Sequence, residues 1–271
     1  VVAGIAAGVI NISYVLSTGC LATTPFTVNP LPASITGNTP VCAGSNISLA
    51  NASSGGTWTS SNPSVAAVGS ATGIVNGVAA GNATITYTLP TGCFTTTVVT
   101  VHPTPAAIAG ASFVCVGQTI TLTDATSGGS WSSSNTSIAT IVSGTGVVTG
   151  VAGGVVTISY TLGTGCMMSA VVTVNPAPNL ASFSPPTATS PCVGGSSVVT
   201  LNSTTIGSGT YTITYDLTGA NASSGNTATV NISSSTGSFT IPAALLPLTG
   251  VQNATIISIT NSFGCITTLS T

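Results

Sequence analysis

Seven cysteines are the side chains of this chain with the widest chemical repertoire: Cys20, Cys42, Cys93, Cys115, Cys166, Cys192 and Cys265. Thiolates can hold a metal, but zinc sites draw on pairs of cysteines two to four residues apart. The two closest cysteines here, Cys20 and Cys42, are 22 positions apart. Disulfide bonds therefore explain the cysteines better than a metal site does, and disulfides persist outside the cytosol.

The other ionisable candidates are one histidine, His102, and two acids, Asp124 and Asp216. A Ser-His-Asp triad needs its histidine beside its acid, and glycoside cleavage needs two carboxylates in one site. Calcium sites between domains need several carboxylates together. Because the three residues are scattered along the chain, the sequence predicts no enzyme, no metal site and no cofactor.

The chain carries almost no charge: it has no lysine or arginine, and its formal net charge is −2. Proteins bind nucleic acid and anionic lipid mainly through lysine and arginine, so neither is an expected partner. Low charge is also typical of membrane helices, which need about 20 consecutive apolar residues. The stretch that comes nearest, residues 1–10, is interrupted by glycine and is half that length. No transmembrane helix is predicted.

An internal repeat organises the chain. Cys115 follows Cys42 by 73 positions, and Trp131 follows Trp58 by the same number. At this offset residues 71–93 match residues 144–166 without a gap, and residues 1–20 match residues 74–93. We therefore expect four parts, namely the end of one copy (1–30), a first complete copy (31–103), a second complete copy (104–176) and a variant module (177–271).

Each complete copy has the pattern of short β-strands separated by Gly, Ser, Asn and Pro turns. In residues 82–89, "NATITYTL", apolar and polar side chains alternate, as in a strand with one buried face. No segment has apolar residues at helical spacing, so essentially no helix is predicted. The strands expected in the first copy are 34–37, 46–50, 56–60, 65–68, 73–78, 82–89 and 94–102.

Three motifs of the repeat carry a family resemblance: SSN-x-S-hydrophobic-A, G-V/I-V-x-G-V-A-x-G and A-T-I-T-Y-T. With a tryptophan between two cysteines, they make residues 1–176 resemble bacterial immunoglobulin-like repeats of group 2, which recur in long surface adhesins. Residues 177–271 resemble them loosely. The resemblance implies an all-β fold of tandem immunoglobulin-like sandwiches, each of about seven strands with one disulfide. Unlike the bond in antibody domains, which crosses the core, this bond is expected to join loops at one end of the sandwich.

One bond per copy gives the pairs Cys42–Cys93, Cys115–Cys166 and Cys192–Cys265. A bond that closes about 50 residues is worth about 4 kcal/mol in the loop-entropy model. Cys20 is left over, since the same spacing would place its partner upstream of residue 1. It is therefore either paired outside the chain or a free thiol, and we expect the chain to be a window of a longer array.

Aromatic residues recur at fixed places in the copies. Trp58 and Trp131 begin a central strand, so we expect them in the core rather than on a surface where sugars stack. Tyr14, Tyr87 and Tyr160 each lie six positions before a cysteine and belong to the same framework. Covalent glycans are a further candidate, because Asn-x-Ser/Thr sequons begin at Asn11, Asn46, Asn51, Asn82, Asn135, Asn202, Asn221, Asn231 and Asn253.

Two functions of different kinds remain. The first is an extracellular structural protein, the stalk of a bacterial surface adhesin that contacts a host or substratum surface. The second is a self-assembling subunit of an extracellular filament, sheath or surface layer, whose partners are other copies of itself; neutral strand edges favour it, because natural sandwiches protect their edges with charges. A glycan-binding lectin is a third interpretation, but no cluster of polar and aromatic residues marks its site.

Overall fold

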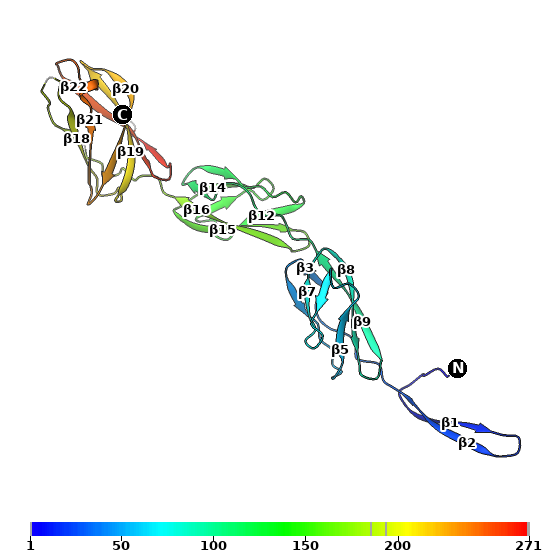
Figure 1. The fold of residues 1–271 in the computed structure, drawn as a ribbon. Helices are drawn as coiled ribbons and strands as arrows, with labels where there is room; N and C mark the ends of the chain where they lie inside the picture. Colours follow the sequence, from blue (N-terminus) through cyan, green and yellow to red (C-terminus); the bar gives the residue numbers. More distant parts are fainter. Residues whose placement is uncertain (1, 185, 193, 270–271) are drawn as a thin grey trace. The chain divides into compact units, whose positions relative to one another are not determined.

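The computed structural model describes residues 2–184, 186–192 and 194–269. The regular secondary structure of these residues is almost entirely β-strand, and the helical segment among them is a single 3-10 turn, η1 (Ala243–Leu245) (Figure 1). The chain divides into two compact units: residues 1–106 with 161–168, and residues 107–160 with 169–271. Each unit is considered by itself.

A β-sandwich formed by the first copy makes up most of the first unit. Its strands are β3 (Pro40–Cys42), β4 (Asn46–Ser48), β5 (Thr57–Ser60), β6 (Ala66–Val68), β7 (Ile74–Gly77), β8 (Gly81–Thr88) and β9 (Phe94–His102). One sheet has the order β3-β9-β8-β5 and the other β4-β7-β6. β3 pairs in parallel with the end of β9, whereas the other pairs are antiparallel.

Alternating side chains supply the core of this sandwich. In β8 the side chains of Ala83, Ile85 and Tyr87 are buried, and those between them are not. The Tyr87 ring lies 4.7 Å from the Trp58 ring, centroid to centroid. Burial of the strand faces that carry these residues holds the two sheets together, since each apolar face is removed from water.

The buried tyrosine also ties down a loop. Its hydroxyl donates a hydrogen bond of 2.6 Å to the Ser53 carbonyl oxygen and accepts one of 2.9 Å from the Gly56 amide. A buried tyrosine hydroxyl needs such partners. Tyr87 therefore fixes the segment that leads into the tryptophan strand.

The second copy, of which all but residues 104–106 and 161–168 belong to the second unit, repeats this architecture. Its sheets have the orders β10-β16-β15-β12 and β11-β14-β13. The Trp131 and Tyr160 rings are again 4.7 Å apart, and the Tyr160 hydroxyl donates to the Thr126 carbonyl oxygen at 2.8 Å. The strands are β10 (Phe113–Cys115), β11 (Thr119–Thr121), β12 (Gly129–Ser133), β13 (Ala139–Ile141), β14 (Val147–Gly150), β15 (Gly154–Leu162) and β16 (Met167–Asn175).

The C-terminal region of the second unit is a sandwich with a different core. Its sheets have the orders β17-β18-β21 and β20-β19-β22-β23. Tyr215 replaces the tryptophan–tyrosine pair at the centre, with its ring 5.0 Å from that of Phe239, and burial raises the pKa of Tyr215. The strands are β17 (Thr187–Ala188), β18 (Ser197–Asn202), β19 (Gly209–Gly219), β20 (Ser223–Ile232), β21 (Thr236–Ile241), β22 (Gln252–Asn261) and β23 (Ile266–Thr268).

An isolated hairpin completes the first unit. β1 (Gly8–Val15) and β2 (Leu21–Val28) form a two-stranded antiparallel sheet. Figure 1 labels it at the blue end of the chain. A two-stranded hairpin without a covered face is at best marginally stable in water.

The all-β class and the tandem sandwiches predicted from the sequence are confirmed. One predicted strand, 34–37, is wrong, because only Thr36 makes an isolated bridge, to Ala50. The strand β3 was missed because it is only three residues long; its Pro40 is at the first residue of an edge strand, where proline is tolerated. The module boundaries stay predictions, since the two compact units do not follow them.

Candidate functional site: disulfides between successive copies

The cysteines fall into two structural classes. Four of them, Cys20, Cys93, Cys166 and Cys265, close the same hairpin turn. In that turn the Leu89 amide donates to the Cys93 carbonyl oxygen and the Gly92 amide donates to the Leu89 carbonyl oxygen, both at 2.9 Å. The turns at 16–20, 162–166 and 261–265 repeat both bonds. We call these four the turn cysteines.

The other three cysteines share a different backbone contact, in which the cysteine carbonyl oxygen accepts a hydrogen bond from the amide three residues later. The Cys42 carbonyl oxygen accepts a hydrogen bond from the Ser45 amide at 3.0 Å. The carbonyl oxygens of Cys115 and Cys192 accept the equivalent bonds from the amides of Gln118 and Gly195. Cys42 ends β3 and Cys115 ends β10. We call these three the strand cysteines.

Each disulfide of the described residues joins a strand cysteine to the turn cysteine of the next copy. Cys42 is bonded to Cys166, with the Cα atoms 5.6 Å apart, and Cys115 to Cys265, with the Cα atoms 5.5 Å apart. The predicted pairs Cys42–Cys93, Cys115–Cys166 and Cys192–Cys265 are therefore wrong. So is one bond within each copy, because the bonds are shifted by one copy along the chain.

The length of one strand explains the correction. Cys42 lies opposite His102 at the end of β9, whereas Cys93 precedes the first residue of the same strand. Nine residues of strand span about 30 Å, and the Cα atoms of a disulfide lie about 4–7 Å apart. The two cysteines of a copy are thus at opposite ends of its sandwich, not in loops at one end as predicted. The second copy has the same geometry, with Cys115 opposite Asn175.

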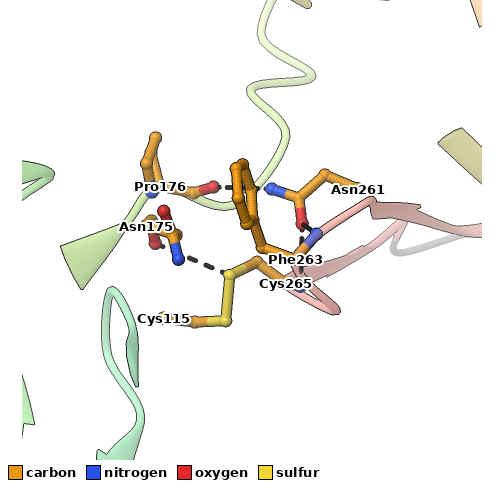
Figure 2. The surroundings of a disulfide bond; sticks show 6 residues. All are labelled: Cys115, Asn175, Pro176, Asn261, Phe263 and Cys265. Carbon is orange, nitrogen blue, oxygen red and sulfur yellow. Dashed lines mark hydrogen bonds between the residues drawn. A yellow bond between two sulfur atoms is a disulfide. The ribbon is translucent and has the colours of Figure 1, made fainter. Parts of the chain in front are cut away.

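The surroundings of the Cys115–Cys265 bond show how the turn is held (Figure 2). The Asn261 side chain donates to the Pro176 carbonyl oxygen at 3.0 Å, and its Oδ1 accepts from the Phe263 and Cys265 amides at 3.0 and 2.9 Å. The Cys265 sulfur lies 3.6 Å from the Asn175 carbonyl oxygen and is fully buried. The turn cysteine therefore sits against the end of the preceding copy.

The shift by one copy accounts for every free cysteine. Cys20, Cys93 and Cys192 are unpaired in this structure. Cys20 and Cys93 are turn cysteines that need a strand cysteine from an earlier copy. Cys192 is a strand cysteine that needs a turn cysteine from a later one. None of the three can find its complement among the described residues.

The ionisable residues of the sequence analysis take local structural roles. His102 lies in β9, where its carbonyl oxygen accepts from the Ala43 amide at 2.8 Å. Asp124 accepts a hydrogen bond from the Thr126 amide at 2.7 Å, and Asp216 accepts one from the Gly225 amide at 2.7 Å. The structure does not bring these three residues together. No group of three or more His, Cys, Asp or Glu side chains is placed to hold a metal in the described part of the chain.

The aromatic framework divides in two. Trp58, Trp131, Tyr87 and Tyr160 are buried, but Tyr14 is 69% exposed on the isolated hairpin. Neither tryptophan presents a face to solvent on which a sugar could stack. Nothing in the structure bears on covalent glycans at the sequons.

A cavity in the C-terminal sandwich is the remaining candidate for a ligand site. It opens beside β17 and β22, with Asn221, Leu248 and Gln252 among its lining residues. Both polar side chains form hydrogen bonds to other residues that line the cavity. The Asn221 side chain bonds the Leu248 amide and carbonyl at 2.7 and 2.8 Å, and the Gln252 side chain accepts from the Asn221 amide at 3.0 Å. No aromatic side chain lines it, so it does not favour the lectin interpretation.

Comparison with protein families decides the affiliation. The family described as bacterial Ig-like domain (group 2) matches residues 22–99 and 94–174, which together cover more than half of the chain. The chain belongs to this family. The matched residues cover the first copy and all but the last two residues of the second, whereas every strand of the C-terminal sandwich lies outside them.

Several solved structures are similar to the chain. Domains 4 and 5 of the S-layer protein SbsC share 20% identity, over 54% of this chain and 99% of that one, with a TM-score of 0.27. The C-terminal 282-residue fragment of intimin, bound to the intimin-binding domain of its translocated receptor, shares 14%, over 56% and 68%, with a TM-score of 0.38. SGBP-B of Bacteroides ovatus, bound to a mixed-linkage heptasaccharide, shares 14%, over 89% and 77%, with a TM-score of 0.24. Among curated proteins, none matches the sequence.

Proposed function

We propose that the protein is a non-enzymatic extracellular structural protein, the stalk of tandem Ig-like modules of a bacterial surface adhesin. The observation that carries this proposal is the pair of disulfides between successive copies. A bond within a copy would stabilise that copy alone. A bond between copies adds a second covalent connection beside the backbone, which is useful where a chain must transmit force.

The same bonds support an extracellular location. Disulfides form and persist in oxidising surroundings, outside the cytosol. In the part of the chain that the structure describes, no helix is long and apolar enough to cross a membrane. We therefore propose that the Ig-like copies stand on the outside of the cell, where they would hold a binding partner such as a host or substratum surface at a distance.

The polar residues of the sandwiches support a passive role. Of the two aspartates, which would be the acids of a catalytic site, Asp124 accepts a backbone amide within its own loop, and Asp216 in β19 accepts the Gly225 amide of the neighbouring strand β20. The buried tyrosine hydroxyls bridge backbone groups of their own copies. These side chains hold loops in place.

The alternative function, an extracellular filament, sheath or surface layer, is favoured by the strand edges. The edge strands of the two complete copies carry no charged side chain. These strands are β3 to β6 in the first copy and β10 to β13 in the second. Charged edges are a common protection against pairing between sheets. Their absence would let copies of the protein associate side by side.

Electron microscopy of native, unreduced protein tests the proposal. The stalk predicts single thin strands, whose width is that of one sandwich and does not depend on protein concentration. Tubes, sheets or regular fibres would contradict it and support the alternative. A sample that has been reduced and alkylated is the matched control, because it keeps the neutral edges and loses the bonds between copies.

A further inference from the structure

The isolated hairpin β1–β2 is half of a sandwich sheet. Its pairing, Gly8 opposite Val28 and Val15 opposite Leu21, repeats that of β8 and β9, where Gly81 lies opposite Val101 and Thr88 opposite Phe94. Its turn carries the same two backbone hydrogen bonds, both 2.9 Å long, as the turn of the first copy. The hairpin therefore already has the shape of the last two strands of a complete copy.

The side chains that should form a core on this hairpin are uncovered. At the offset of 73 residues, Tyr14 corresponds to Tyr87 and Phe26 to Val99. Tyr14 is 69% exposed and Phe26 38%, whereas Tyr87 is 5% exposed and Val99 is fully buried. Ile10 is likewise exposed, and it corresponds to the buried Ala83. In the first copy the strands β3 to β7 complete the sandwich over these positions.

The turn cysteine of the first copy is placed to bond whatever covers that face. The Cys93 thiol donates a hydrogen bond of 3.9 Å to the carbonyl oxygen of Asn29, just after β2. Cys265 takes the same position against Asn175, where its partner Cys115 lies opposite Asn175 in the parallel pairing of β10 with β16 (Figure 2). Asn29 and Asn175 occupy equivalent positions of the repeat. Cys93 therefore occupies the position of a bonded turn cysteine but is free.

We propose that the exposed face of β1–β2 together with Cys93 is an acceptor site for the front half of a further Ig-like copy, with strands like β3 to β7. The strand of this segment that is equivalent to β3 would pair in parallel with the end of β2. Its strand cysteine would then lie opposite Asn29 and form a disulfide with Cys93. Cys20, 73 positions before Cys93, would take no part in that bond.

The occupant to which we commit is a segment of the same polypeptide that leads into the hairpin. Residues 2–4, "VAG", correspond to residues 75–77, "VNG", of β7. In the first copy β7 pairs with β4 and β6, but residues 2–4 are not in a strand. Residues 2–4 thus carry the sequence of the end of a front half without its strand pairing.

The bond itself is an ordinary oxidation. Two thiols lose two protons and two electrons, and a small disulfide such as oxidised glutathione accepts them and leaves as two thiols. The proposal holds equally for a stalk and for a filament, because it concerns how one copy is completed and bonded to the next. An array built in this way would carry one such bond at every junction.

A stitched chain tests the site directly. A duplicate of residues 31–73 is placed immediately before Val1, which restores the repeat without a new linker, and the protein is oxidised with glutathione. We expect a peptide map of the unreduced protein to link the duplicated Cys42 to Cys93. We also expect backbone amides of residues 9–28 to exchange hydrogen at least about a hundredfold more slowly than in the original chain.

Two variants of the stitched chain serve as matched controls. Cys93→Ser should abolish the new bond and keep the slow exchange, and Cys20→Ser should change neither. A bond from the duplicated cysteine to Cys20, or hairpin amides that exchange as fast as in the original chain, would overturn the proposal. A concentration-dependent dimer of the original chain with protected hairpin amides would overturn it too, since a second copy would then be the occupant.

A peptide measurement on the original chain does not depend on the folding of the stitched one. A peptide of residues 37–46, with its cysteine activated as a mixed disulfide with glutathione, should exchange onto Cys93 at least about tenfold faster than onto Cys20, because pairing beside β2 raises its effective concentration there. Cys192 provides a second exposed thiol for reference. Equal rates at Cys93 and Cys20 would contradict the acceptor site.

Discussion

Replacing Asp124 with asparagine should stabilise the second Ig-like copy, and its counterpart in the first copy shows why. In the first copy this position is Asn51, whose amide donates to the Ala33 carbonyl oxygen at 2.6 Å and whose Oδ1 accepts from the Ser53 amide at 2.9 Å. Asp124 keeps the second kind of bond, from the Thr126 amide at 2.7 Å. Its other oxygen, Oδ2, is buried without a hydrogen-bond partner.

The magnitude follows from these contacts. An unpaired buried acceptor costs about 1–3 kcal/mol, and an amide that donates as Asn51 does adds about 0.5–1.5 kcal/mol. With both contributions, we expect Asp124→Asn to raise the free energy of unfolding of the second copy by about 1.5–4.5 kcal/mol. For a domain of this size, each kcal/mol corresponds to roughly 4–8 °C in Tm. The reverse change in the first copy, Asn51→Asp, should lower its stability by a similar amount.

The two tryptophans allow each copy to be followed separately within the whole chain. In a Trp58→Phe background, the fluorescence of Trp131 reports the unfolding of the second copy in urea. The effect of Asp124→Asn is measured in this background, and that of Asn51→Asp in a Trp131→Phe background. An unchanged urea midpoint for both substitutions would refute the reasoning, because it would mean that the Asp124 oxygen is satisfied by solvent.

Three further predictions concern single side chains. Tyr87→Phe removes the hydroxyl that bonds Ser53 and Gly56 and should destabilise the first copy by about 1–3 kcal/mol, read from the urea midpoint of Trp58 fluorescence; no shift would mean that the hydroxyl bonds contribute nothing net. Gly73→Ala should destabilise the same copy by more than about 2 kcal/mol. A Cβ there would meet the Leu49 carbonyl and come within 3.0 Å of the Trp58 ring, and the φ of +70° adds backbone strain. Gly55→Ala is the control: its φ is +80° but nothing lies within 4 Å of a Cβ, so it should cost about 1–2 kcal/mol. Burial raises the pKa of Tyr215 above 10.0. Its contribution to stability is therefore complete below pH 10 and is lost as the pH rises through the folded-state pKa. Tyr215→Phe should weaken the alkaline loss of stability of the C-terminal sandwich, measured by its urea midpoint between pH 8 and pH 11, and an unaltered pH profile would contradict this.

The repeat allowed much of the fold to be predicted. A residue pattern that recurs after 73 positions must fold in the same way twice, and the contacts of Trp58 with Tyr87 and of Trp131 with Tyr160 do agree. Strands such as β8 were predictable because one face is buried, which imposes alternation. The sequence was least informative where pairing partners lie far apart along the chain.

The disulfides show that limit. Their pairing depends on β3, a three-residue strand whose place is set by parallel pairing with the far end of β9. No local pattern reveals such a partner, so spacing along the sequence pointed to the nearer cysteine. The unpaired Cys20 gave no signal, because it is left over both by pairing within each copy and by the shift of one copy. Tyr14 was predicted as framework from its spacing alone, and spacing does not tell whether the opposing strands are present.

The shifted bonds also change what a protease can achieve. A single cut anywhere between residues 42 and 166 leaves its two products joined by Cys42–Cys166, and a cut between residues 115 and 265 leaves them joined by Cys115–Cys265. The two ranges overlap, so one broken peptide bond from residue 42 to residue 265 cannot shorten the protein. Trypsin-like enzymes find no lysine or arginine to begin with. Separating the two ends within this range requires a reductant or three cuts, one in each of the segments 42–115, 115–166 and 166–265.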